Sequence, residues 1–205
     1  MGFYQDRLLP RLIARVMRNK RLTEIRARVI SAAEGRVLEI GIGSGLNLPF
    51  YGPRVTRIIG LDPSAALLRM AEAQAREVGR TVDFLPAAAE ILPLDDASVD
   101  TIVTTWTLCS VGRAASALAE ARRVLRPGGR LLFAEHGRSP DAGVRAWQDR
   151  LTPLWRRVAG NCHLNRSIAD LIEEAGFRME RLETGYGVPG PRPLTYLYEG
   201  MARPR

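Results

Sequence analysis

The chain has 205 residues, of which 46% are hydrophobic and 25% charged; this length and composition are ordinary for one globular domain that buries a core. Its formal net charge is +8. The two cysteines, Cys109 and Cys162, exclude a disulfide scaffold and have no zinc-site spacing, so we expect no metal. No apolar run approaches the roughly 18 residues of a spanning helix, and the arginine-rich start excludes a signal peptide, so we expect a cytoplasmic protein.

The positive charge is concentrated at the start of the chain. Residues 1–36 hold nine basic and three acidic side chains, so 9 − 3 = 6 of the +8 lie there and we expect no nucleic-acid partner. The segment QDRLLPRLIARVMRN predicts an amphipathic helix with separate leucine and arginine faces. Either this helix packs over the domain, or it contacts anionic lipid at the inner face of the membrane and guides an amphiphilic substrate. A second helix is expected over residues 22–33, and residues 1–35 are interpreted as a helical lid.

Short strands and helices alternate over the remaining residues, 36–205. Runs rich in Val, Ile and Leu predict strands that are covered on both faces. Helices are expected between them, including one that begins behind Ser64 and one that stops at Pro127-Gly128-Gly129. This alternation predicts a parallel, doubly wound sheet with right-handed crossovers. The expected strands cover residues 36–42, 57–61, 82–85, 99–105 and 130–135.

The end of the chain departs from this alternation. Residues 143–160 predict a helix with a stripe that contains Trp147 and Trp155, which we expect either to pack in the core or to form a wall of a substrate pocket. After a helix over residues 166–176, strands 177–186 and 193–204 are joined by a turn too short for a helical crossover, so they must be antiparallel. The predicted fold is therefore α/β: a Rossmann-like, doubly wound, seven-stranded sheet of five parallel strands plus a C-terminal antiparallel hairpin, with helices on both faces.

The sequence VLEIGIGSG places Gly41, Gly43 and Gly45 directly after the first strand. A glycine-rich turn lets a ligand approach the backbone, and the start of a following helix attracts negative charge. The spacing is not the G-x-G-x-x-G of a dinucleotide site, and no P-loop lysine follows. Asp62, which ends the second strand 62 − 41 = 21 residues after Gly41, suits a ribose diol; its alternative role is to cap the helix near Ser64.

Four segments together resemble the class I S-adenosylmethionine-dependent methyltransferases, over essentially the whole chain: VLEIGIGSG, GLDPS, AEILPLDDASVDTIVTTWTLCSV and RVLRPGGRLLFAEHG. The resemblance implies S-adenosyl-L-methionine as the cofactor and S-adenosyl-L-homocysteine as its product. It implies that Glu39 and the turn Gly41–Gly45 hold the methionine moiety. It further implies that Asp62 takes the ribose hydroxyls and that Pro63 lies along the adenine.

The same resemblance implies roles for two later segments. The backbone of Ala89 and Glu90 would meet the adenine edge, although Ala88 stands where many relatives carry an Asp. Thr105 and Thr107, at the end of the fourth strand, would lie beside the sulfonium.

The segments TLCSV and EHG, a Trp-rich stretch and Cys162 in GNCHLNRS are similar to thiol S-methyltransferases. Methyl transfer needs the acceptor aligned at roughly 3 Å and water excluded, and it needs a strong base only for a poor nucleophile. The absence of an obvious catalytic constellation therefore favours thiols, amines and easily ionised groups. We expect a thiol acceptor. The alternatives are the amine of phosphatidylethanolamine, a quinone precursor, or a cofactor-binding protein without catalysis.

Few residues are candidates for acceptor chemistry. His136 is either a base, which would make it catalytic with Thr107, or a structural hydrogen-bond partner. Tyr4, Trp106, Cys109 and His163 are the candidates for substrate binding, while Cys109 and Cys162 are alternatively buried apolar fillers. The partner is expected to be a small or lipid-like molecule, and the chain a monomer or homodimer.

Overall fold

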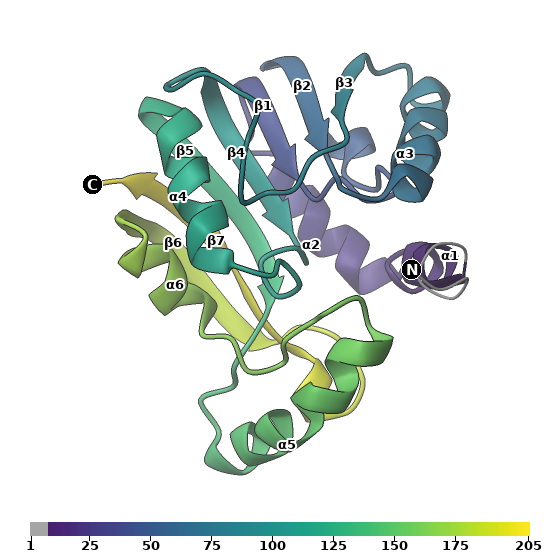
Figure 1. The fold of residues 1–205 in the computed structure, drawn as a ribbon, viewed down its shortest axis with the longest axis vertical. Helices are drawn as coiled ribbons and strands as arrows, with labels where there is room; N and C mark the ends of the chain where they lie inside the picture. Colours follow the sequence, from purple (N-terminus) through teal and green to yellow (C-terminus); the bar gives the residue numbers. More distant parts are fainter. Residues whose placement is uncertain (1–7) are drawn as a thin grey trace.

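A seven-stranded sheet runs through the computed structural model, which describes residues 8–205. Strands β1 to β5 pair in parallel, whereas β7 is antiparallel to both β5 and β6. This confirms the predicted sheet with its C-terminal hairpin. The strand order is β3 (Val82–Leu85), β2 (Val55–Leu61), β1 (Gly35–Ile40), β4 (Val99–Thr105), β5 (Leu125–His136), β7 (Tyr196–Pro204) and β6 (Phe177–Tyr186) (Figure 1).

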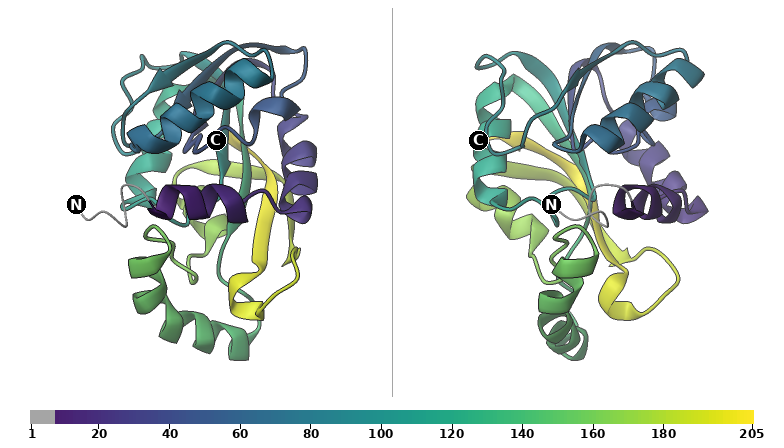
Figure 2. Two further views of the ribbon diagram at one scale, coloured as in Figure 1. Left: turned by 90° about the vertical axis from the view of Figure 1, so that its right-hand side faces the viewer. Right: turned by 45° about the vertical axis from the view of Figure 1, so that its right-hand side comes forward.

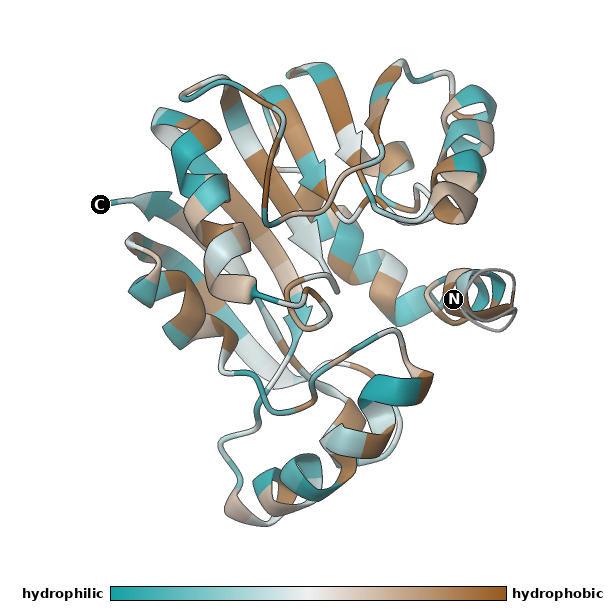
Figure 3. Ribbon diagram, in the orientation of Figure 1, coloured by the Kyte–Doolittle hydropathy of each residue, from teal (hydrophilic) through white to brown (hydrophobic). Residues whose placement is uncertain are grey.

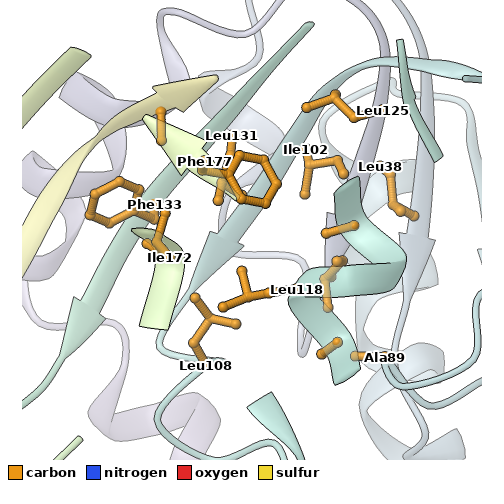
Figure 4. Close-up of a cluster of buried hydrophobic side chains, with 14 of the residues drawn as sticks. Leu38, Ala89, Ile102, Leu108, Leu118, Leu125, Leu131, Phe133, Ile172 and Phe177 are labelled. Carbon is orange, nitrogen blue, oxygen red and sulfur yellow. The ribbon is translucent and has the colours of Figure 1, made fainter. Parts of the chain in front are cut away.

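Helices cover both faces of the sheet, as predicted (Figure 2). Helices α2 (Lys20–Ile30) and α3 (Ala65–Glu77) bury aliphatic side chains against one face. Helices α4 (Ala114–Val124) and α6 (Ile168–Glu174) pack on the other, where Leu118 and Ile172 join Phe133 in one buried cluster (Figure 4). Burial of one such side chain stabilises the fold by roughly 1.5–3 kcal/mol. Helix α2 belongs to this core, whereas α1 (Leu9–Val16) contributes no residue to either buried cluster; the lid over residues 1–35 stays a prediction.

The crossover between β1 and β2 differs from the expectation of a helix after the glycine turn. Across residues 41–54, which the structure describes in full, the only helical element is the three-residue 3₁₀ helix η2 (Leu48–Phe50). Pro49, Gly52 and Pro53 interrupt any longer helix. No helix dipole therefore follows the turn, and a ligand there meets backbone amides and side chains only.

Strand β5 begins earlier than predicted. Helix α4 ends at Val124, and Leu125 already pairs with Val99 of β4. A register shift between Val99 and Thr101 accommodates the Arg126–Gly129 segment inside the strand. The RPGG sequence is thus a bulged strand start and not a loop.

Helix α5 (Ala142–Val158) lies beyond the carboxyl ends of the parallel strands (Figure 1). Apolar and polar residues alternate along it (Figure 3), and its buried residues are Gln148 and Thr152. The Gln148 amide donates to the carbonyls of Gly137 (3.0 Å) and Pro193 (3.2 Å). Trp147, in contrast, is 55% exposed. Core packing of Trp147 is therefore wrong: hydrogen bonds of Gln148 dock the helix, Trp147 and Leu154 are exposed, and Trp155 is half-buried.

Helix α1 lies against the loop that follows α5. A Cβ atom built on Gly160 would be 3.5 Å from the Cδ1 atom of Ile13 and 4.0 Å from a methyl group of Leu9. On the outer side of α1, Leu12 and Val16 are exposed. Among residues 8–205, no helix is both long enough and apolar enough to cross a bilayer.

Candidate active site

The glycine turn follows β1 with all three glycines at positive φ: 73° for Gly41, 56° for Gly43 and 79° for Gly45. A Cβ atom on Gly41 would lie 2.2 Å from the Oγ1 atom of Thr107, and one on Gly45 would lie 3.0 Å from Leu48. On Gly43 it would meet, among residues 8–205, only the Gly41 carbonyl at 3.9 Å. Gly41 and Gly45 thus permit close packing, while Gly43 leaves the backbone open to a ligand.

Asp62 joins the end of β2 to this turn. Its buried carboxylate accepts from the backbone amides of Gly43 (3.1 Å) and Ser64 (2.8 Å). The cap of α3 is Ser64, whose hydroxyl accepts from Leu67 N at 3.4 Å. Burial raises the pKa of Asp62, and the two amides oppose that shift. Asp62 is therefore free of the capping role and faces the turn, while Pro63 beside it is exposed.

Glu39 is buried beneath the same turn. Its carboxylate accepts from the Asn47 side-chain amide (2.8 Å) and from the Tyr51 hydroxyl (2.7 Å). The Asn47 amide also donates to Thr105 Oγ1 at 3.0 Å. Burial raises the pKa of Glu39 to about 7. Glu39 thus ties the segment 47–51 to the ends of β1 and β4, and neither Asn47 nor Tyr51 was predicted.

Asn47 leaves one polar atom unused. Its Oδ1 atom is buried and has no hydrogen-bond partner within the described part of the chain. A buried acceptor without a donor costs about 1–3 kcal/mol unless a ligand or water supplies one. The atom therefore marks a place for a hydrogen-bond donor beside Glu39.

A second buried acid, Glu135, orders the turn after β4. It accepts from the Thr104 hydroxyl, from Thr107 N (3.1 Å) and from Cys109 N (3.3 Å). Burial raises its pKa to about 7. Glu135 was not predicted as a site residue, although it belongs to the EHG segment. Its position at the end of β5, opposite the end of β4, gives it this role.

Trp106 lies between these two acids in an unusual conformation. Its φ is +52°, in the left-handed region that bulky residues rarely adopt. The Arg26 guanidinium lies 4.5 Å from the centre of its ring and donates to the carbonyl of Met17 at 2.9 Å. Burial lowers the pKa of Arg26 to about 10, against the opposing effect of Glu39. Arg26, counted in the sequence only among the basic residues of the N-terminus, therefore connects α1 and α2 to the site.

A cavity of about 200 Å³ lies next to this cluster. It separates the end of α1 from the residues that follow the glycine turn. Its walls combine two arginines with apolar side chains and include Met17, Arg18, Arg26, Leu46 and Phe50.

His136 is buried at the end of β5. Its Nε2 atom is 3.3 Å from the Pro193 carbonyl, so Nε2 carries the proton and donates. Its Nδ1 atom forms no regular hydrogen bond with any described residue, although the Cys162 thiol lies beside the ring. The Nδ1 lone pair therefore faces the side of the Cys162 thiol and makes no regular hydrogen bond within the described residues.

The positions of the other predicted residues relate less directly to the glycine turn. Ala89 is buried in the loop after β3, and the Glu90 carboxylate accepts from Arg113 N at 3.1 Å, which ties it to the start of α4. His163 donates its backbone amide to the Cys109 carbonyl at 2.7 Å, and burial lowers its pKa to about 4. Tyr4 lies outside the described residues. The structure thus brings together the turn, Glu39, Asp62 and the segment 105–109.

The chain is similar to known methyltransferases in sequence and in fold. Residues 38–133 match the family model described as a methyltransferase domain. Human (Homo sapiens) thiol S-methyltransferase TMT1B is 32% identical over 94% of this chain and 79% of that protein. The chain spans a smaller share, 63%, of the rat (Rattus norvegicus) protein of that name.

Two bacterial relatives have other names. The phosphatidylethanolamine N-methyltransferase of Cereibacter sphaeroides is 33% identical over 52% of this chain and 53% of that protein. The demethylmenaquinone methyltransferase of Beutenbergia cavernae is 31% identical over 78% of this chain and 69% of its own length. Among solved structures, the YcgJ protein of Bacillus subtilis superposes with a TM-score of 0.66 at 24% identity, covering 80% of this chain and 71% of that one.

Proposed function

Because the chain belongs to the S-adenosylmethionine-dependent methyltransferases, we propose that it methylates a small or amphiphilic acceptor, and a thiol before others. The cofactor supplies an electrophilic methyl group. The protein then has to hold the acceptor in line, remove its proton and exclude water.

The residues at the turn fit this cofactor. The open backbone at Gly43 and the buried carboxylate of Asp62 suit the methionine and ribose portions, respectively. The unpartnered Oδ1 atom of Asn47 suits an ammonium group. We assign Glu39 a supporting role, because both of its oxygens already accept hydrogen bonds inside the protein.

The observation that carries the thiol proposal is the state of His136. The imidazole donates through Nε2 to the Pro193 carbonyl, which leaves Nδ1, beside the Cys162 thiol, as the nitrogen that can accept a proton. An imidazole is an effective base near neutral pH, which suits the proton of a thiol and not that of an alcohol. Nδ1 of His136 would take the proton of the acceptor thiol; the cofactor would supply the methyl group to that sulfur and leave as S-adenosyl-L-homocysteine. We place Trp106 and Cys109 along the acceptor path.

The acceptor is proposed to enter from the side of α1. The cavity beside Arg18 and Arg26 has apolar walls from Met17 and Phe50, which suits a molecule with an apolar part. The outer face of α1 combines exposed Leu12 with exposed arginines. These features also favour the second candidate, an acceptor carried in an anionic phospholipid surface, such as a lipid amine or a quinone precursor.

One assay separates these acceptors. The full chain is incubated with methyl-labelled cofactor and, separately, with an alkyl thiol, phosphatidylethanolamine vesicles or a quinol. We expect label on the alkyl thiol; label on the lipid or the quinol alone would replace the thiol proposal, and no label in any arm would favour a cofactor-binding protein.

The same assay tests His136. His136→Gln should slow alkyl thiol methylation by at least about 10-fold at pH 7 and flatten its pH dependence. An aryl thiol that is already ionised needs no base, so its rate should change little. An equal loss with both thiols would make His136 structural.

A further inference from the structure

The two cysteines, distant in sequence, lie in loops that are bound to each other. Cys109 is in the turn after β4, and Cys162 follows α5. Two hydrogen bonds to backbone carbonyls join the loops: His163 N donates to the Cys109 carbonyl at 2.7 Å, and the Asn161 side chain donates to the Ser110 carbonyl at 2.8 Å. Arg166 adds a hydrogen bond to the carbonyl of Leu108. These contacts hold the two loops together, so that each thiol is close enough to influence the pKa of the other.

The two thiols differ in exposure and in acidity. Cys109 is 2% exposed, whereas Cys162 is half-buried. The hydrogen bond from Cys109 lowers the pKa of Cys162, and His136 and Trp155 act in the same direction. The same contact, together with burial, raises the pKa of Cys109. Burial opposes the lowering at Cys162 but does not reverse it, so Cys162 is the more acidic thiol of the pair.

Packing alone does not require this arrangement. Two apolar residues would fill the space between the loops as well as two thiols do. A partly exposed, acidic thiol beside a second, buried thiol is instead the arrangement found in redox-sensitive cysteines, where the second thiol resolves the oxidised first one.

We propose that Cys162 and Cys109 form a redox pair that a hydroperoxide converts into a disulfide. The Cys162 sulfur, after losing its proton, attacks the peroxide O–O bond, which breaks; Cys162 becomes a sulfenic acid, and the leaving alkoxide or hydroxide takes up that proton to form an alcohol or water. The Cys109 sulfur, after losing its proton, then attacks the Cys162 sulfur and expels hydroxide, which takes up that proton to form water. Two electrons pass from the two sulfurs to the peroxide. A dithiol reductant reverses the change.

The disulfide would affect the candidate site directly. Cys109 lies two residues after Thr107, and its backbone amide donates to Glu135. A covalent link would fix this turn to the loop after α5, so that the segment next to Trp106 could no longer move separately. We expect methyl transfer to decrease in the oxidised chain and to recover on reduction.

Mass spectrometry tests the pair without reference to methyl transfer. The full chain is treated with increasing hydrogen peroxide, its remaining thiols are alkylated under denaturing conditions, and it is digested. The proposal expects Cys109 and Cys162 to lose alkylation together, in equal amounts, as one peptide pair linked by a disulfide appears. Dithiothreitol should restore both thiols.

Two variants give the order of events. Cys109→Ser should leave Cys162 as a sulfenic acid that dimedone traps, and Cys162→Ser should leave Cys109 with less than about a tenth of the wild-type reactivity towards peroxide. Circular dichroism checks that each variant folds, and the wild-type result stands without them. Over-oxidised Cys162 with no linked peptide, or a link between two chains, would overturn the proposal. Because the readout is thiol mass, it is independent of the acceptor.

Discussion

Asp62 has two roles, one in holding the fold together and one, as proposed, in binding the ligand. Its two oxygens accept from the amides of Gly43 and Ser64, so it already fixes the glycine turn relative to the start of α3. A carboxylate accepts more than two hydrogen bonds. It can therefore hold the turn and still receive the hydroxyls of a ribose.

Replacing Asp62 by Ala should weaken S-adenosylmethionine binding by about 10-fold or more, because hydrogen bonds to a buried carboxylate are lost together with the support of Gly43. Calorimetric titration measures this. Asp83→Ala is the matched control, since Asp83 forms an exposed ion pair with Arg57 on the neighbouring strand. Equal affinities of wild type and Asp62→Ala would remove the ribose assignment.

At this scale the sequence predicted the residues that belong to one motif. The glycines and Asp62 stand at a spacing that can be read along the chain. Asn47, Arg26 and Glu135 could not be predicted, because their roles depend on contacts between separate elements: Arg26 reaches Trp106 from a helix that precedes β1. Of these three, Asn47 has a feature that is visible in the sequence: it is a polar residue that closely follows the glycine turn.

At the scale of elements, α1 and α5 share one property: each turns apolar side chains outward near the site. Leu12 is 53% exposed on α1, and Leu154 is 62% exposed on α5. Exposed arginines accompany both, including Arg15 and Arg157. Leucines beside arginines suit a surface of anionic lipid better than they suit water.

Leu12→Asp should reduce binding to vesicles that contain anionic phospholipid by about 10-fold, since one leucine contributes roughly 1.5–3 kcal/mol when buried. Co-sedimentation at low salt measures the bound fraction. Leu182→Asp provides the control, because Leu182 is an exposed leucine on the distant edge strand β6. Should the two variants bind alike, or wild type not bind at all, the membrane role of α1 is wrong.

The elements show which bounds and orientations could be predicted from hydrophobic periodicity and which could not. Strands β3 and β4 were predicted with their observed bounds, because short aliphatic runs end at clear breaks. For α5 the apolar stripe was visible, but a periodic pattern does not tell which side faces the protein, and the buried Gln148 decides it. The helix expected after the glycine turn was excluded by Pro49 and Pro53, a signal present in the sequence.

For the molecule as a whole, the two buried acids link the site to stability. Glu39 and Glu135 lie at the carboxyl ends of β1 and β5, and burial raises the pKa of each from the ordinary 4.5 to about 7. Between these values the folded chain binds more protons than the unfolded chain. Their contribution to stability is therefore complete below about pH 4.5 and decreases as the pH rises to about 7.

Glu135→Gln isolates this effect, because a glutamine does not ionise. The free energy of unfolding of wild type minus that of Glu135→Gln should decrease by about 3 kcal/mol from pH 4.5 to 7 and level off above; the pKa difference of 7 − 4.5 = 2.5 corresponds to about 3.5 kcal/mol in all, part of which falls outside this range. Shifted groups that have no contact with Glu135, such as Glu39 and Asp62, affect both chains alike and cancel in the difference. Urea denaturation at each pH measures it. The same difference for Glu77→Gln, at an exposed position on α3, should stay constant. A difference for Glu135→Gln that stays constant would mean that folding leaves the pKa of this carboxyl unchanged, and a difference that increases with pH would mean that the fold holds it ionised and that Glu135 orders the turn after β4 as an anion.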